Sequence, residues 1–237
     1  MKLGIMQPYF LPYIGYISLV KHTDMFVLLD EVQFIRHGWI ERNRILKPAE
    51  GWQYIQVPLK KRHQSDLIKN IKINNDIDWE RKILAQIEHY KKKAPYYRRA
   101  VDLLENIFSK KYTSIVALNH EALHSVCDYL SIKKDIRIYS EMNLSIGPLV
   151  EPDDWALNIS KALNADEYRN LPGGKSIFNR EKFDKANITL NFHQIAMDEY
   201  PQKANTTFEP NLSILDVIMY NSPEKINQML DNYKHFI

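Results

Sequence analysis

The chain has 237 residues, of which 45% are hydrophobic and 26% charged, a composition that is typical of globular proteins and excludes long disordered tails. The formal net charge of +3 excludes the strongly basic footprint of a DNA-binding protein, so no DNA partner is expected. The single cysteine cannot form an intrachain disulfide, the first residues lack the pattern of a signal peptide, and no apolar run approaches the roughly 20 residues of a membrane helix. A cytoplasmic protein without a membrane span is therefore expected.

The first 30 residues predict a strand, a helix and a second strand. Leu3–Met6 and Met25–Leu29 are short apolar runs without polar alternation, which is typical of parallel strands buried on both faces. Between them, Tyr13–His22 has its apolar residues at helical spacing. We therefore expect a Rossmann-like βαβ unit at the N-terminus.

The rest of the chain is predicted to alternate between helices and strands. An extended piece at Gln53–Pro58 precedes a helical block from about Trp79 to Leu130, which Pro95 interrupts. Later elements are predicted in this order: strand Ile136–Tyr139, helix Trp155–Leu163, strands Glu167–Leu171 and Ile188–Ile195, and helices Leu212–Tyr220 and Glu224–Phe236. The simplest architecture is one α/β domain over residues 1–237, with a mainly parallel sheet and a helical insertion at about residues 75–130.

The segment Gln7–Tyr16 lies where the first strand leads into the first helix, a position that lines the ligand crevice of open α/β sheets. Gly15 permits close backbone approach, and the helix N-terminus offers free N–H groups to a phosphate. The turn resembles the proline-containing turn of the nucleotidyltransferase and class I aminoacyl-tRNA synthetase superfamily, except that tyrosines replace both histidines of its His-x-Gly-His motif. Tyrosine donates a hydrogen bond to a phosphoryl oxygen without carrying a positive charge, and its alternative role is to pack the helix. The candidates here are Tyr13 and Tyr16 for catalysis and Gln7 and Tyr9 for binding.

An acidic pair, Asp30 and Glu31, directly follows the second predicted strand. Carboxylates at the end of a strand can hold a metal, a sugar hydroxyl or an amine, and the arginines that follow suit a phosphate or a carboxylate. A surface ion-pair loop is the alternative, but a tryptophan is seldom left exposed in such a loop. The binding candidates of this segment are Gln33, Arg36, Trp39, Arg42, Asn43 and Arg44.

A glycine pair follows the predicted strand at residues 167–171. The run Pro172–Ser176 invites comparison with a phosphate-binding loop, but Arg169 stands where the Walker pattern requires a glycine. A backbone nest at Gly173 and Gly174, with Lys175 beside it, could still hold an anion, and a plain glycine turn is the alternative.

The start of a late helix supplies the last candidates. Asn211 can cap this helix, and Ser213 and Asp216 lie three residues apart on one side of it. They could contact a ligand or support residues that do. The histidines show no metal-ligand spacing, so no metal is assigned and no cofactor is evident.

Together these segments resemble the WbqC-like protein family. Its motifs Met-Gln-Pro-Tyr-Phe-x-Pro-Tyr-x-Gly-Tyr, Asp-Asp/Glu-Val-Gln-Phe and Gly-Trp-x-x-Arg-Asn-Arg are present at Met6–Tyr16, Asp30–Phe34 and Gly38–Arg44. Glu31 stands where many relatives have a second aspartate, and Arg169–Leu171 replaces a Ser-Gly step, which could alter what the following loop admits. Later matches are Ala94–Tyr97, Pro172–Lys175, Tyr200–Gln202 and Pro210–Asp216.

The resemblance implies a role in bacterial polysaccharide and O-antigen synthesis, with transfer of an amino acid such as glycine to a sugar. We therefore expect a transferase that moves an aminoacyl or acyl group from a donor to the amino group of a nucleotide-linked amino sugar. The alternatives are a non-catalytic nucleotide-sugar binding or scaffold protein and a nucleotidyltransferase-like enzyme. The expected roles are orientation or deprotonation of the amine by Asp30 or Glu31, stabilisation of phosphate or oxyanion by Tyr13, Tyr16 and the Gly173–Gly174 backbone, and diphosphate binding by Arg42, Arg44 and Lys175.

Overall fold

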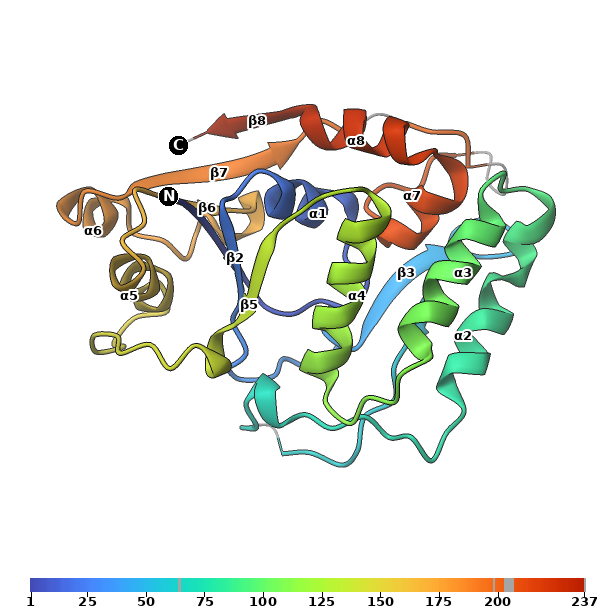
Figure 1. Ribbon diagram of the computed structural model, residues 1–237, viewed down its shortest axis with the longest axis horizontal. Helices are drawn as coiled ribbons and strands as arrows, with labels where there is room; N and C mark the ends of the chain where they lie inside the picture. The colour runs from blue at the N-terminus through green and yellow to red at the C-terminus, as the bar shows by residue number, and fades with distance from the viewer. Residues whose placement is uncertain (64, 198, 203–206, 237) are drawn as a thin grey trace.

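The computed structural model describes residues 1–63, 65–197, 199–202 and 207–236. Its centre is a six-stranded sheet in the order β5-β2-β1-β6-β7-β8, in which β8 runs antiparallel to β7 and the other neighbours are parallel (Figure 1). This confirms the prediction of an α/β protein with a mainly parallel sheet. The strands of this sheet are β1 (Lys2–Met6), β2 (Met25–Leu28), β5 (Asp135–Ile138), β6 (Glu167–Asn170), β7 (Thr189–Ile195) and β8 (Tyr233–Phe236).

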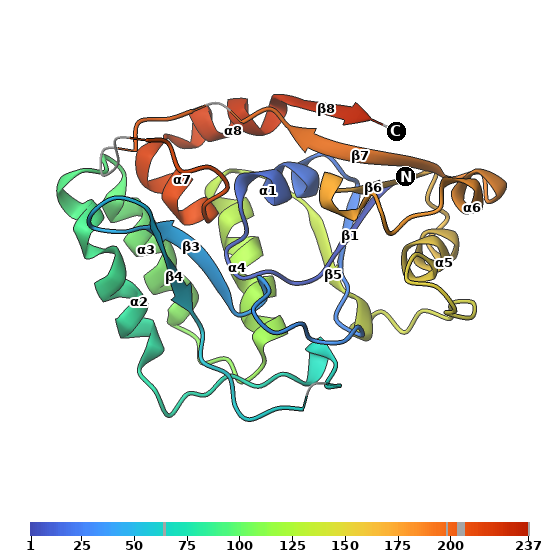
Figure 2. The same ribbon diagram turned by 180° about the vertical axis from the view of Figure 1, so that it is seen from behind.

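Helices cover both faces of the sheet, as the two opposite views show (Figures 1 and 2). Helices α1, α4 and α8 pack on one face, and α5 and α6 pack on the other. Among the described residues, no helix combines the length and the apolar character needed to cross a lipid bilayer. The helices are α1 (Ile14–Lys21), α2 (Trp79–Ile87), α3 (Tyr97–Phe108), α4 (Ile115–Tyr129), α5 (Asp154–Ala162), α6 (Arg180–Lys185), α7 (Ile214–Tyr220) and α8 (Pro223–Asp231).

The N-terminal β1-α1-β2 unit forms where the sequence predicts it. Phe26 and Leu28 join the core under α1, whereas Leu3, Ile5 and Val27 join the core under α5. Because successive side chains of a strand point to opposite faces, both faces of β1 and β2 are buried, which explains their uninterrupted apolar runs.

The predicted helical block is confirmed as three helices, α2, α3 and α4, which lie between β4 (Trp52–Gln56) and β5. The break at Pro95 separates α2 and its short 3-10 continuation from α3. The extended piece predicted near residues 53–58 corresponds to β4. The single-domain boundary and the Rossmann-like character of the first unit stay predictions.

One local prediction is wrong, and one strand was not predicted. The helix predicted over Glu224–Phe236 ends at Asp231, and the chain then forms β8 along the edge of β7. Arg42–Leu46, for which the sequence predicts no strand, is strand β3, which pairs antiparallel with β4 in a separate ribbon. In both segments the hydrogen bonds come from a neighbouring strand, which the local apolar pattern does not reveal.

A chain of hydrogen bonds, buried at Ser18 and His193, attaches this C-terminal edge to α1. The Ser18 hydroxyl donates to the Leu230 carbonyl at 2.6 Å and therefore accepts from His193 Nε2 at 2.8 Å. His193 Nδ1 can then accept from His235 Nε2, which lies at 3.1 Å. Burial, together with the neighbouring His22 and His235, lowers the pKa of His193 to about 3, so the ring is neutral at neutral pH.

Acid should therefore weaken this attachment. Because the folded-state pKa of His193 is about 3 and the unfolded value is about 6.5, the stability due to the neutral ring is complete above pH 6.5 and is lost as the pH falls towards 3. The difference in unfolding free energy between wild type and His193→Gln should shrink by about 2 kcal/mol between pH 7 and pH 5. Urea unfolding of both proteins at each pH measures this difference in free energy. Groups that titrate equally in the two proteins do not contribute to it. A difference that does not change with pH would show that the folded protein protonates His193 without cost.

Candidate functional site

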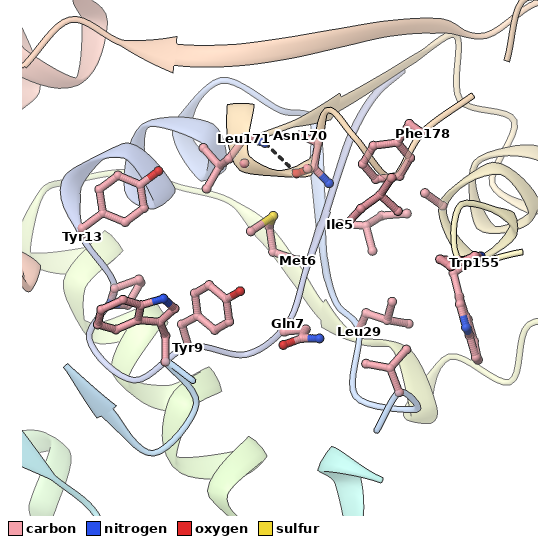
Figure 3. A pocket seen from close by; sticks show the side chains of 18 of the residues that line it. Ile5, Met6, Gln7, Tyr9, Tyr13, Leu29, Trp155, Asn170, Leu171 and Phe178 are labelled. Atoms are coloured by element: carbon pink, nitrogen blue, oxygen red, sulfur yellow. Dashed lines mark hydrogen bonds between the residues drawn. The ribbon is translucent and has the colours of Figure 1, made fainter. Parts of the chain in front are cut away.

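A cavity of about 970 Å³ opens at the carboxyl ends of β1, β2 and β6. The chain places β2 and β5 on one side of β1 and then β6 and β7 on the other, and ligand crevices form where the order of strands reverses in this way. In Figure 3, Tyr9 and Tyr13 lie on one side of the cavity, Leu29 and Trp155 on the other, and Gln7 between them. Of the candidate residues, those that line the cavity are Gln7, Tyr9, Tyr13, Glu31, Gln33, Trp39, Asn43, Arg44, Gly173, Gly174 and Asn211.

The sequence missed the opposite wall, which contains Trp155 of α5, Tyr168 and Asn170 of β6, and Phe178. Asn170 is fixed because its Nδ2 donates to the Tyr168 hydroxyl at 2.5 Å and its Oδ1 accepts from the Leu171 N–H at 2.7 Å. The one sequence signal for this wall is the departure from the family pattern at residues 169–171. The structure places two of these three residues, Asn170 and Leu171, in the lining.

The loop after β1 is held through its carbonyl groups, which accept hydrogen bonds from distant parts of the chain. These hydrogen bonds hold Leu11 at a φ of 43°, a left-handed conformation that residues other than glycine rarely adopt. It also fixes the positions from which Gln7, Tyr9 and Tyr13 enter the cavity. The donors are Tyr16 Oη to Gln7 O (3.0 Å), Asn119 Nδ2 to Pro8 O (2.8 Å), Asn43 Nδ2 to Phe10 O (3.0 Å) and Leu11 O (2.9 Å), Ser213 Oγ to Leu11 O (2.7 Å), and Ile214 N to Pro12 O (2.9 Å).

The two candidate catalytic tyrosines have different positions. Burial, together with Tyr9, raises the pKa of Tyr13 to about 12, so Tyr13 is a neutral donor that lines the cavity. Its ring lies over Gly15, where an added Cβ would come within 2.4 Å of the ring, so this glycine makes room for Tyr13 rather than for a ligand. Tyr16 is fully buried outside the lining, and its hydroxyl holds the loop.

The two carboxylates of the acidic pair also separate. Asp30 is 1% exposed, and its two oxygens accept from the N–H and the hydroxyl of Ser140, at 3.0 and 2.6 Å, so it fixes the end of β5 outside the lining. Glu31 lines the cavity and pairs with Lys69 at 2.5 Å, a contact that raises the pKa of Lys69. Glu31 is therefore the carboxylate of the pair that can meet a ligand.

The candidate arginines divide between the cavity and its surroundings. Arg44 lines the cavity with its guanidinium over the rings of Trp39 and Trp52, at 5.4 and 5.1 Å. Its Nη2 donates to the Asn211 carbonyl at 3.2 Å, but its buried Nε has no hydrogen-bond partner. Arg42 lies outside the lining, where it stacks on Tyr54 and donates to the His37 carbonyl at 2.6 Å.

The glycine pair forms a 3-10 turn, Pro172–Gly174, which corresponds to the plain glycine turn rather than to the backbone nest, the two alternatives that the sequence leaves open. Neither glycine has the positive φ of an αR-αL nest, and the N–H groups of Gly174 and Lys175 donate to the carbonyls of Leu171 and Pro172. Both glycines still line the cavity, whereas the Lys175 ammonium lies over the ring of Phe236 at 5.4 Å.

The remaining candidates on α7 and the preceding loop also lie in different places. Asn211 is in the lining, Ser213 holds the loop after β1, and Asp216 is completely buried away from the cavity. Arg36 borders a second, smaller cavity. Within the described residues, no group of three or more His, Cys, Asp or Glu side chains could hold a metal ion.

Comparison with known proteins adds one decisive finding. A model of the WbqC-like protein family matches residues 7–228, which contain all of the cavity lining except Ile5 and Met6. The chain belongs to the WbqC-like protein family. This WbqC-like protein is 26% identical over 219 residues to the uncharacterized protein Rv1507c of Mycobacterium tuberculosis, and the alignment covers 92% of each chain. No solved structure matches it.

Proposed function

We propose that this WbqC-like protein is a cytoplasmic transferase of cell-surface polysaccharide (O-antigen) synthesis that acylates or aminoacylates the amino group of a nucleotide-linked amino sugar. The observation that carries the proposal is the lining of the cavity, which contains the Glu31 carboxylate, Trp39 and Arg44, whose buried Nε is unpaired and whose guanidinium lies over the rings of Trp39 and Trp52. Aromatic rings suit a nucleobase, a guanidinium suits a diphosphate, and a carboxylate suits an amine.

The chemistry assigns different tasks to these groups. Glu31 would orient the sugar amine and accept its proton while the amine nitrogen forms a bond to the acyl carbon. The leaving group of the donor would depart with the electron pair of the broken bond. Tyr13, which is neutral and half-buried, would donate a hydrogen bond to a phosphate or to the developing oxyanion. Asp30 and Tyr16 would act through position, Asp30 by fixing the end of β5 and Tyr16 by holding the loop after β1.

The proposal predicts that two substitutions separate recognition of the amine from recognition of the diphosphate. Wild type should bind a UDP- or dTDP-amino sugar at least about tenfold more tightly than the matching hydroxyl sugar, since a hydrogen bond between charged groups contributes about 1.5 to 3 kcal/mol. Glu31→Gln should remove this preference, whereas Arg44→Ala should weaken both ligands about equally. Isothermal titration calorimetry measures all four affinities without knowledge of the acyl donor.

Exposed residues of α3 provide matched controls. Glu105→Gln and Arg98→Ala remove the same charges from an ion pair on the surface and should leave both affinities unchanged. Equal wild-type affinity for the amino and hydroxyl sugars would refute amine recognition. Binding with no modified sugar in mass spectra, whatever acyl donor is added, would instead favour a non-catalytic binding protein. Pyrophosphate release from a nucleoside triphosphate and magnesium would favour nucleotidyl transfer.

A further inference from the structure

A second cavity, of about 290 Å³, is lined entirely by polar and charged side chains. None of its lining residues lines the first cavity, so it is a separate site. Its volume is below the range of about 300 to 1,000 Å³ that is common for cofactor-sized ligands, which suits a smaller molecule. The lining residues are Arg36, His37, Glu41, Gln56, Lys61 and Arg62.

Glu41 is the unusual member of this lining. The residue is 2% exposed, and its Oε2 is buried without a hydrogen-bond partner. The Nε of Arg62 is likewise buried and unpartnered. A buried carboxylate oxygen without a partner is costly, and burial raises the pKa of Glu41, although a hydrogen bond from its own backbone N–H and the nearby Arg62, Arg42 and His37 act in the opposite direction. The fold therefore keeps an unsatisfied acceptor atom and an unsatisfied donor atom on two residues of this lining.

The charges around the cavity are also unmatched. Arg36, Lys61 and Arg62 take part in none of the ion pairs of the described chain, and neither does Glu41. A simple anion would pair with the cations but would leave Glu41 Oε2 without a donor and would repel the carboxylate. A simple cation would meet Glu41 but would be repelled by the three surrounding positive charges.

A ligand that carries both charges close together meets both requirements. We propose that the second cavity binds a small zwitterion of the amino-acid type. The ammonium group donates to Glu41, the carboxylate is held by the surrounding arginine and lysine side chains, and His37 and Gln56 offer further hydrogen-bonding groups. This site is independent of the nucleotide sugar proposed for the first cavity.

Calorimetric titration of the full chain with the standard amino acids tests the proposal. For the tightest binder, the N-acetyl derivative and the amide each lack one of the two charges. We expect both derivatives to bind at least about tenfold more weakly than the free amino acid, because each loses a charge-assisted hydrogen bond. Inorganic phosphate or acetate that binds as tightly as any amino acid would overturn the proposal, and so would the absence of amino-acid binding at millimolar concentration.

Glu41→Gln supplies a second, independent readout. The substitution keeps the shape of the side chain but removes the unpaired charge, so we expect the ligand-free variant to unfold roughly 2 to 4 °C higher than wild type. Its affinity for the amino acid should fall at least about tenfold, whereas the exposed control Glu105→Gln should change neither quantity. A lower unfolding midpoint for Glu41→Gln would show that the carboxylate stabilises the fold and would overturn the assignment. A wild-type chain that binds the amino acid but no nucleotide sugar would count against the proposed function alone.

Discussion

Replacement of Asp216 by alanine should lower the free energy of unfolding by about 3 to 5 kcal/mol, because each buried donor that loses its acceptor costs about 1 to 3 kcal/mol. Asp216 lies on α7 with no exposed surface and accepts hydrogen bonds from Tyr90 Oη at 2.6 Å, Tyr200 Oη at 2.7 Å and Gln202 Nε2 at 3.2 Å. Without the carboxylate, buried donors lose their acceptor and a cavity remains. The substitution should also weaken the attachment of β3, because the Tyr90 hydroxyl that donates to Asp216 accepts from the Leu46 N–H of β3 at 2.7 Å.

The pH dependence of this loss gives a second check on Asp216. Burial raises the pKa of Asp216 to about 6 in the folded state, against about 3.8 in the unfolded state. The folded protein therefore binds this proton more tightly than the unfolded protein does. The stability that this preference contributes is complete below pH 3.8 and is lost as the pH rises through 6. Wild type should therefore exceed Asp216→Ala by roughly 1 to 2 kcal/mol more at pH 5 than at pH 7.5.

Urea unfolding of the two proteins at both pH values measures these effects. Asp102→Ala is the matched control, since Asp102 is exposed on α3 and pairs only at the surface with Arg98. We expect it to change the unfolding free energy by less than about 0.5 kcal/mol. An Asp216→Ala loss as small as that of the control would contradict the buried network.

The elements that could be predicted are those whose signal is local. The apolar runs of β1 and β2 are visible in the sequence because both faces of these strands are buried, and the spacing of α1 is visible because its apolar residues pack in one core. β3 and β8 were missed because their backbone partners, β4 and β7, cannot be read from their own residues. In β3, the buried Asn43 and Ile45 alternate with the half-buried Arg42 and Arg44, but a polar residue at a buried position obscures the pattern.

The candidate site could be predicted as a region but not as a set of contacts. Gln7 and Glu31 were found because parallel strands bring their carboxyl ends to one edge of the sheet. The motifs could not reveal which of their residues face the cavity and which hold the loop, as Tyr16 and Ser213 do. Trp155 was missed because an apolar residue at helical spacing looks like any core residue until the tertiary packing is known.

Asn43→Ala should lower the free energy of unfolding by about 2 to 4 kcal/mol and weaken binding of a nucleotide sugar in the first cavity by about tenfold or more. The side chain is 3% exposed, donates from Nδ2 to the carbonyls of Phe10 and Leu11 at 3.0 and 2.9 Å, and accepts from the Arg44 N–H at 2.8 Å. Its removal leaves the buried Phe10 carbonyl without this donor and releases the loop that positions Tyr9 and Tyr13.

Asn43→Asp distinguishes the hydrogen bonds from simple packing. Aspartate keeps the volume and the acceptor for Arg44 but places an oxygen against the carbonyls of Phe10 and Leu11, so it should destabilise at least as much as alanine does. If packing alone mattered, Asn43→Asp would be close to wild type, and that result would contradict the role of Asn43 as a donor. Asn106→Ala, on the exposed face of α3, is the matched control and should change neither stability nor affinity. Urea unfolding and calorimetry on the same variants show whether stability and affinity fall together, as they must if one side chain both completes the fold and sets the shape of the cavity.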